Sequence, residues 1–187
     1  MQKLWLKKPK LSYNKEVIDI VQFGSSIFLD SNPRDVDIVV IFNKIPIKDQ
    51  LIETQKIKRQ LENFTDIPLH MSSFDLYGFF DKSNFSREGI LFYGKSLIRE
   101  NYFAEQFGLK PKIQISYYLK KLQKKDKIRF NYMLNGRGEK YGILRRFNGL
   151  LIAPGIIEID PGFEKIFVAN IRKIISDFTI RKILLQK

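Results

Sequence analysis

The segment that most constrains the fold of this chain is residues 36–42, Val-Asp-Ile-Val-Val-Ile-Phe. Apolar and β-branched residues dominate it, which is typical of a β-strand. A second strand is predicted at residues 17–23, and it ends at Gly24-Ser25-Ser26. Residues 31–34, Ser-Asn-Pro-Arg, have the composition of a turn, so the two strands are expected to follow one another closely.

A helix and a third strand are predicted next. Leucine and isoleucine recur at roughly helical spacing among charged residues over 48–64, which predicts an amphipathic helix. A strand is expected at 67–72 and a short helix at 74–80. The order strand, turn, strand, helix, strand predicts an α+β fold, with a mixed sheet and helices packed against it.

Two carboxylates stand at the start of the predicted strand 36–42. Asp35 and Asp37 are two residues apart, so on a strand their side chains point to the same face. Mg²⁺ takes one or two protein carboxylates and completes its shell with water and substrate phosphates. Two such ions about 4 Å apart stabilise the attacking and leaving oxygens of phosphoryl transfer. The pair is therefore a candidate metal site, although such a pair at a strand edge is often only solvated.

The turn Gly24-Ser25-Ser26 is the second candidate element. After a strand, its backbone N–H groups and a hydroxyl are suited to hold triphosphate oxygens, whereas the alternative is a simple turn. Nine residues separate Gly24-Ser25 from Asp35. Each element alone is a weak signal, but their occurrence on consecutive strands is much less common by accident.

This combination resembles the nucleotidyltransferase superfamily of the DNA polymerase β type. The resemblance rests on a pattern of four parts: a strand, a Gly-Ser turn, a short connection, and Asp-x-Asp at the start of a second strand. Residues 87–95, Arg-Glu-Gly-Ile-Leu-Phe-Tyr-Gly-Lys, are similar to the segment that usually closes the family's domain. The resemblance covers roughly residues 17–99. The remainder is similar, less specifically, to the C-terminal extension of archaeal nucleotidyltransferase-domain proteins, in its blocks at 130–138 and 153–161.

The resemblance implies transfer of a nucleoside monophosphate from a nucleoside triphosphate to a hydroxyl, with Mg²⁺ (or Mn²⁺) as cofactor. It implies that Asp35 and Asp37 are catalytic metal ligands and that Gly24, Ser25 and Ser26 contact the nucleotide. Family enzymes usually carry a third carboxylate on the strand after the helix. Here residues 65–71 read Thr-Asp-Ile-Pro-Leu-His-Met, so Pro68 or His70 replaces that acid, depending on the register.

His70 has two interpretations. A histidine near neutral pH can act as a base or a ligand, which makes His70 a candidate catalytic residue. A lone histidine is more often a half-buried strand residue with a satisfied hydrogen bond. The chain holds this one histidine and no cysteine, which excludes thiol catalysis, thiolate zinc sites and sites that need two histidines.

The net charge of +13 is distributed unevenly. Residues 1–100 hold 15 basic and 13 acidic side chains, whereas residues 101–187 hold 18 and 7. We therefore predict a nucleotidyltransferase-like domain at 1–100 and a small basic α+β domain at 101–187. Within the second, residues 108–146 carry 12 basic residues against Asp126 and Glu139, which favours a nucleic-acid partner, RNA more than DNA.

Several elements are expected in this basic half. Helices are predicted at 116–124 and 127–135, the second ending at Gly136-Arg137-Gly138. Strands are predicted on both sides of residues 153–155, followed by a helix from Asp160-Pro161 to about Ser176 and a final strand at 179–185. The candidate nucleic-acid-binding residues are Lys120, Lys121, Lys124, Lys125, Lys127, Arg129, Arg137, Arg145 and Arg146.

Aromatic residues are interleaved with these cations. Tyr117, Tyr118, Phe130 and Tyr132 can stack on unpaired bases, but aromatics at helical spacing are more often part of a core, which is the interpretation we favour.

Three functions remain open at this point. The first is a nucleotidyltransferase with a nucleic-acid acceptor or a protein acceptor. The second is a catalytically degenerate scaffold that binds nucleic acid. The third, by family analogy alone, is one half of a two-component system with a protein partner. The longest clean apolar run is the five residues 38–42, and no targeting segment is visible, so we expect a cytoplasmic protein without a membrane partner.

Overall fold

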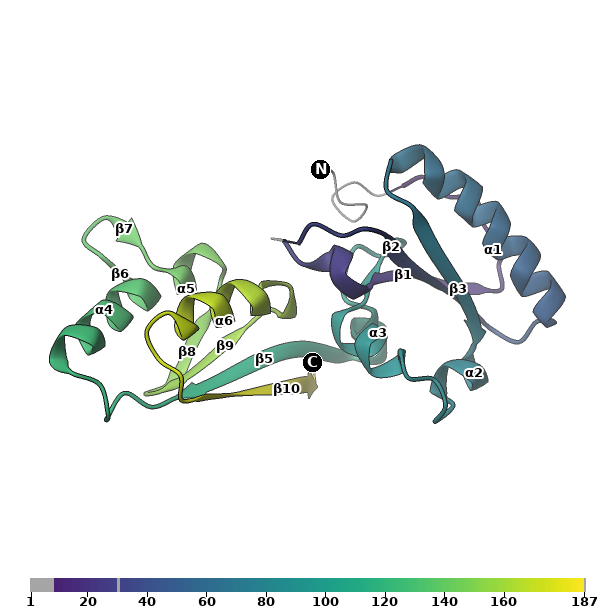
Figure 1. Ribbon diagram of the computed structural model, residues 1–187. Helices are drawn as coiled ribbons and strands as arrows, with labels where there is room; N and C mark the ends of the chain where they lie inside the picture. Colours follow the sequence, from purple (N-terminus) through teal and green to yellow (C-terminus); the bar gives the residue numbers. More distant parts are fainter. Residues whose placement is uncertain (1–8, 30, 187) are drawn as a thin grey trace. The chain divides into compact units, whose positions relative to one another are not determined.

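A computed structural model of the chain describes residues 9–29 and 31–186. The chain divides into unit 1, which ends at Leu109, and unit 2, which begins at Lys110. Figure 1 shows that each unit combines a β-sheet with helices. The predicted α+β class is therefore confirmed.

The sheet of unit 1 is built around β2 (Val36–Phe42), the strand predicted at these residues. β1 (Val17–Phe23) pairs antiparallel with β2 on one side, and β3 (Leu69–Asp75) pairs parallel with it on the other. β4 (Lys95–Ser96) pairs antiparallel with β1. The sheet order is thus β3-β2-β1-β4, and the sheet is mixed, as expected.

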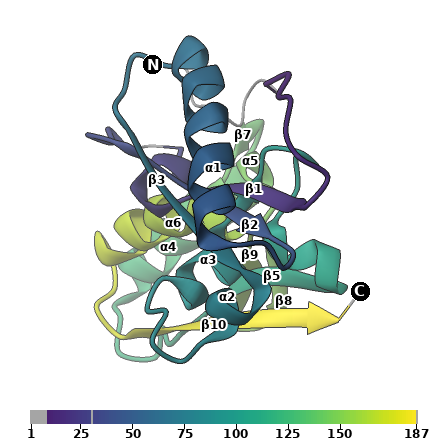
Figure 2. The same ribbon diagram turned by 90° about the vertical axis from the view of Figure 1, so that its right-hand side faces the viewer.

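One face of β2 is covered by α1 (Ile47–Leu61). Ile38 and Val40 are fully buried there with Ile57 and Leu61 of the helix. Figure 2 looks onto α1, with β1 and β2 behind it. The helix predicted at 48–64 is therefore present, and its last turn continues as a short 3₁₀ helix, η3 (Glu62–Phe64).

The other face of β2 packs against a second group of helices. Val39 and Ile41 are buried there with Phe79 and Phe103. The elements on this side are α2 (Leu76–Phe80), α3 (Arg87–Tyr93) and the 3₁₀ helix η4 (Phe103–Phe107). A strand buried on both faces needs an almost continuous apolar sequence, which explains the composition of β2.

Unit 2 contains a second sheet, with the order β10-β5-β9-β8. Its strands are β5 (Leu109–Tyr117), β8 (Leu150–Ala153), β9 (Ile156–Ile159) and β10 (Phe178–Gln186). The strands predicted on both sides of residues 153–155 are thus confirmed. β9 pairs antiparallel with both β5 and β8.

The helix predicted at 116–124 is wrong. Residues 109–117 form β5, and the segment that follows has no regular structure until Lys124. Pro111, Ile113 and Ile115 are buried in β5, whereas the residues between them are less buried. This alternation of buried and less buried residues has the period of a strand. Residues 116 and 117, with which the predicted helix began, therefore belong to β5, although the lysines after them have helical spacing.

The other elements of unit 2 follow the prediction more closely. α4 (Lys124–Asn135) ends at Gly136, as expected. The hairpin of β6 (Gly136–Arg137) and β7 (Lys140–Tyr141) leads to a short helix. The remaining helices are α5 (Ile143–Arg146), η5 (Pro161–Phe163) and α6 (Glu164–Arg172), and α6 ends before the predicted limit near Ser176. In the part of the chain that the structure describes, no helix is long and apolar enough to cross a bilayer.

A buried carboxylate ties β1 to the segment after β4. Asp19 is fully buried, and it accepts hydrogen bonds from the Ser96 hydroxyl at 2.7 Å and from an Arg99 Nη1 at 2.8 Å. Burial raises the pKa of Asp19, and the bonds to Ser96 and Arg99 oppose that rise. The Asp19 carboxylate is therefore stable inside unit 1 only because Ser96 and Arg99 bind it.

We expect Arg99→Gln to destabilise the protein by about 2 kcal/mol, because it leaves the Asp19 carboxylate buried without its counterion. This loss of stability is smaller than is usual for a fully buried ion pair, since the Arg99 side chain is 41% exposed and water can partly replace it. Chemical denaturation measures the change. Arg59→Gln, at an exposed position of α1, is the control. Equal stabilities of the two variants would contradict the prediction.

Candidate functional site

The turn after β1 lies directly against Asp37. Gly24 begins the 3₁₀ helix η2 (Gly24–Ile27) and has a φ of +71°. A Cβ atom at this position would collide with the Asp37 carboxylate. Phe23 is paired with Asp37 in the sheet, so the end of β1 and the start of β2 meet here. The glycine is therefore required both by its backbone conformation and by the close approach of the carboxylate.

His70 lies beside the same carboxylate. It pairs with Asp37 in the parallel register of β2 and β3, and its Nδ1 is 3.2 Å from Asp37 Oδ1. The His70 side chain is 76% exposed, whereas that of Asp37 is 24% exposed. This register places His70, and not Pro68, opposite Asp37. The imidazole is hydrogen-bonded, as the structural interpretation expected, but it is exposed instead of half-buried.

Asp35 is placed differently from Asp37. It lies in the bend that precedes β2 and is exposed. Among residues 9–29 and 31–186, no group of three or more His, Cys, Asp or Glu side chains has the arrangement of a metal site. The structure thus brings Gly24, Asp37 and His70 together. Asp35 lies two residues before Asp37 in the chain.

The two serines of the turn differ in their surroundings. Ser25 is exposed. Ser26 is 1% exposed, and its hydroxyl donates to the Phe23 carbonyl and accepts from Gln22 Nε2 at 2.9 Å. Ser26 therefore stabilises the turn from inside, and Ser25 is the serine that faces solvent. Gln22 is a member of this arrangement that the sequence reasoning missed, and its only signal was a polar residue within an apolar strand.

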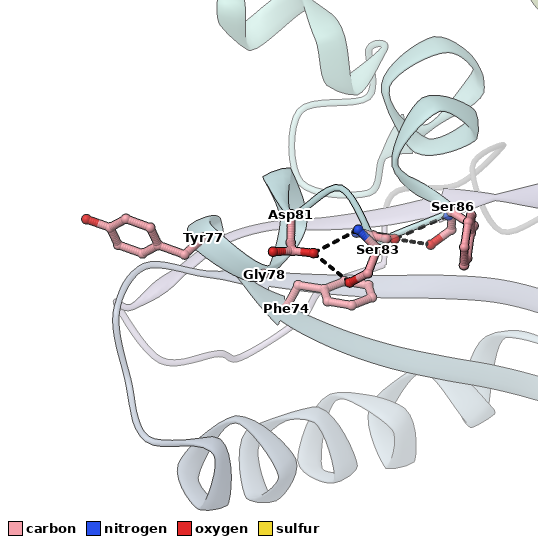
Figure 3. A pocket seen from close by; sticks show the side chains of 8 residues that line it. Phe74, Tyr77, Gly78, Asp81, Ser83 and Ser86 are labelled. Atoms are coloured by element: carbon pink, nitrogen blue, oxygen red, sulfur yellow. Dashed lines mark hydrogen bonds between the residues drawn. The ribbon is translucent and has the colours of Figure 1, made fainter.

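A cavity in unit 1 lies at the other end of β3. Figure 3 shows its lining, which includes Phe74, Tyr77 and Asp81, and its volume is about 690 Å³. Hydrogen bonds from the Ser83 hydroxyl and backbone N–H hold the pKa of Asp81 below its usual value. Since β3 begins beside Asp37 and ends at Asp75, this cavity is separate from the Gly24–Asp37–His70 group.

The predicted basic residues of unit 2 are mostly exposed. The exposed members are Lys120, Lys121, Lys124, Lys125, Arg129, Arg137, Arg145 and Arg146, and Lys127 is partly exposed. They lie before and along α4, on β6 and on α5. α4, the β6–β7 hairpin and α5 contact one another. Cations far apart in this part of the sequence are therefore carried by one group of elements.

The aromatic residues of this region fall into two classes. Tyr117 and Phe130 are buried, with ring centroids 4.8 Å apart, so for these the core interpretation holds. Tyr118 and Tyr132 are 66% and 44% exposed, so for these two the core interpretation is wrong. The Arg137 guanidinium lies 5.1 Å from the ring centroid of Tyr132. Tyr141, which the sequence reasoning missed, is 51% exposed and has Arg145 at 3.9 Å.

Comparison of the sequence with models of known protein families found no match, and comparison with curated protein sequences found none either.

Gly24→Ala tests the close approach of the turn to Asp37. We expect a loss of stability well above that of Gly108→Ala, because both glycines have φ = +71° but only Gly24 lacks room for a Cβ. The conformation alone costs about 1–2 kcal/mol, which Gly108→Ala measures. Chemical denaturation of both variants gives the comparison. Equal losses would mean that the Gly24–Asp37 approach is loose.

Proposed function

We propose that the chain is a nucleotidyltransferase, which transfers a nucleoside monophosphate from a nucleoside triphosphate to a hydroxyl group. The observation that carries this proposal is the packing of Gly24, in the turn after β1, against the Asp37 carboxylate of β2. The resemblance to the polymerase β type superfamily rests on these same two elements. The order β1, η2, β2, α1, β3 in a mixed sheet is what that resemblance predicts.

The residues present fit Mg²⁺ or Mn²⁺. Asp37 offers a partly exposed carboxylate and Asp35 an exposed one, and Mg²⁺ needs only one or two protein carboxylates besides water and phosphate oxygens. The ion would neutralise phosphate charge and stabilise the attacking and leaving oxygens. Carboxylate and water ligands suit Mn²⁺ as well as Mg²⁺, so both ions are tested in the assay below.

Each residue of the group has a role in this proposal. Gly24 lets the turn approach Asp37 closely, and exposed Ser25 offers a hydroxyl to the triphosphate. His70, hydrogen-bonded to Asp37, takes in this proposal the place that the third acid has in family enzymes. Its exposed ring is available to accept the proton of the acceptor hydroxyl.

The acceptor in this proposal is nucleic acid, with RNA favoured over DNA, bound by unit 2. The support is the charge of residues 108–146 and the exposure of the cations there. Lysines and arginines on an exposed surface neutralise phosphates and release counterions, which gives affinity for any polyanion.

Asp37→Asn is expected to lower transfer activity at least about 100-fold, since a metal ligand matters no less than the groups that orient one. The assay follows label from α-³²P-labelled nucleoside triphosphates into RNA, DNA or protein, with Mg²⁺ and with Mn²⁺. Asp49→Asn, at an exposed position of α1, should keep full activity. No metal-dependent transfer by the unaltered protein from any of the four triphosphates would contradict the proposal.

A second candidate function is a catalytically inactive scaffold that binds nucleic acid. The observation that favours it is His70 at the position of the third carboxylate. In this case Asp35→Asn leaves nucleic-acid binding unchanged, and transfer is absent from the unaltered protein too. Binding assays at several salt concentrations measure this, and binding that does not weaken as salt rises would contradict it.

A further inference from the structure

We propose that the β6–β7 hairpin and its neighbouring helices bind single-stranded nucleic acid, with unpaired bases stacked on two arginine–tyrosine pairs. We call this the hairpin surface and define it by Tyr132, Arg137, Lys140, Tyr141 and Arg145. It deepens the proposed function, on which it rests, by naming the class of acceptor that unit 2 holds. The elements that carry the hairpin surface are α4, β6, β7 and α5, which contact one another within unit 2 and are labelled in Figure 1.

The first argument is the positive charge of the hairpin, where Arg137 and Lys140 outnumber Glu139, the acidic residue of its turn. Arg137 and Lys140 are directly paired across β6 and β7, and both are exposed. Like charges directly opposite each other destabilise a strand pair. Among residues 9–29 and 31–186, no carboxylate forms an ion pair with Arg137, Lys140 or Arg145. A bound anion would relieve this repulsion.

The hairpin is also held in one shape. Gly136 has a φ of +94°, and a Cβ there would collide with the Lys140 carbonyl. A Cβ at Gly142 would collide with the Leu134 carbonyl at the end of α4. The short hairpin therefore approaches α4 closely, and its two strands are paired in one register.

The second argument is the pair of arginine–tyrosine contacts. Arg137 lies 5.1 Å from the ring centroid of Tyr132, and Arg145 lies 3.9 Å from that of Tyr141. Both tyrosines remain about half exposed, Tyr132 at 44% and Tyr141 at 51%. A guanidinium on a tyrosine ring keeps its N–H groups free for phosphates, and both planes are surfaces on which an unpaired base can stack.

The two arguments together favour a single strand over a duplex or an anionic membrane. A duplex offers phosphates but keeps its bases stacked inside, so it makes no use of the exposed rings. A membrane offers anionic headgroups but no planar partner for a guanidinium–tyrosine pair. Single-stranded nucleic acid supplies both phosphates and free base faces.

The test measures fluorescence anisotropy of the full chain with labelled oligouridine and oligothymidine of about 16 nucleotides and a duplex of equal length. We expect both single strands to bind more tightly than the duplex. Replacing Tyr132 and Tyr141 together by Leu should weaken single-strand binding at least about tenfold, since each stacked base contributes roughly a fivefold factor or more. Replacing both by Phe should preserve it.

Two controls keep the result interpretable. Tyr77→Leu removes a tyrosine of unit 1 that is 79% exposed, and it should leave binding unchanged. Replacing Arg137 and Lys140 together by Gln, both at exposed positions, should reduce the slope of log affinity against log salt by about 1.4. The same double change should not lower the melting temperature, because it removes a repulsion.

Three outcomes would overturn the inference. These are equal affinity for duplex and single strand, unchanged single-strand affinity in the double Leu variant, and binding to phosphatidylserine vesicles that excludes the oligonucleotides. Label transfer separates this inference from the proposed function. A chain that binds single strands through this surface but transfers no label contradicts only the proposed reaction. A chain that transfers label but binds single strand and duplex equally contradicts only the hairpin surface.

Discussion

The burial of β2 on both faces is the constraint on which unit 1 depends. Ile38 and Val40 pack against α1, and Val39 and Ile41 pack against the opposite group of helices. β2 cannot shift without breaking the contacts of both faces, because each face packs closely against different helices. Asp37 stands in this strand at the end where β1 finishes and β3 begins. The rigid centre of the sheet therefore sets the position of the carboxylate on which the proposed chemistry depends.

The two units differ in charge, although each contains ion pairs, such as Lys112–Glu158 in unit 2. In unit 1 the buried carboxylate of Asp19 is matched by Ser96 and Arg99, so the sheet carries a compensated charge. In unit 2 the cations of α4 and of the hairpin stand exposed, and Arg137 faces Lys140. Compensated charges serve stability, whereas uncompensated charges of one sign favour an anionic partner. This contrast agrees with the proposal that unit 1 carries the reaction and unit 2 binds nucleic acid.

Prediction from sequence succeeded where a single pattern dominated. β1, β2 and α1 were predicted closely because the apolar periodicity and the turn residues Gly-Ser indicated the same element boundaries there. It failed at β5, where an apolar alternation of only a few residues was followed by a lysine-rich stretch with helical spacing. The candidate site was predicted only as a set of residues. The motif named Gly24 and Asp37, but their close approach and the solvent access of Ser25 and Ser26 came from the structure, because they depend on how the turn folds and on which hydroxyl it uses.

Residue patterns alone predict that β2 is a strand, that a glycine turn precedes two carboxylates, and that most of the positive charge lies in the second half of the chain. These properties follow from composition and local periodicity, which short segments carry alone. The folded chain was needed to show that His70 lies opposite Asp37 and that Arg137 and Arg145 lie on the rings of Tyr132 and Tyr141. The first depends on the register of two strands joined through a helix. The others depend on how a helix, a hairpin and a second helix pack, and such contacts between segments leave no periodic signal in the sequence.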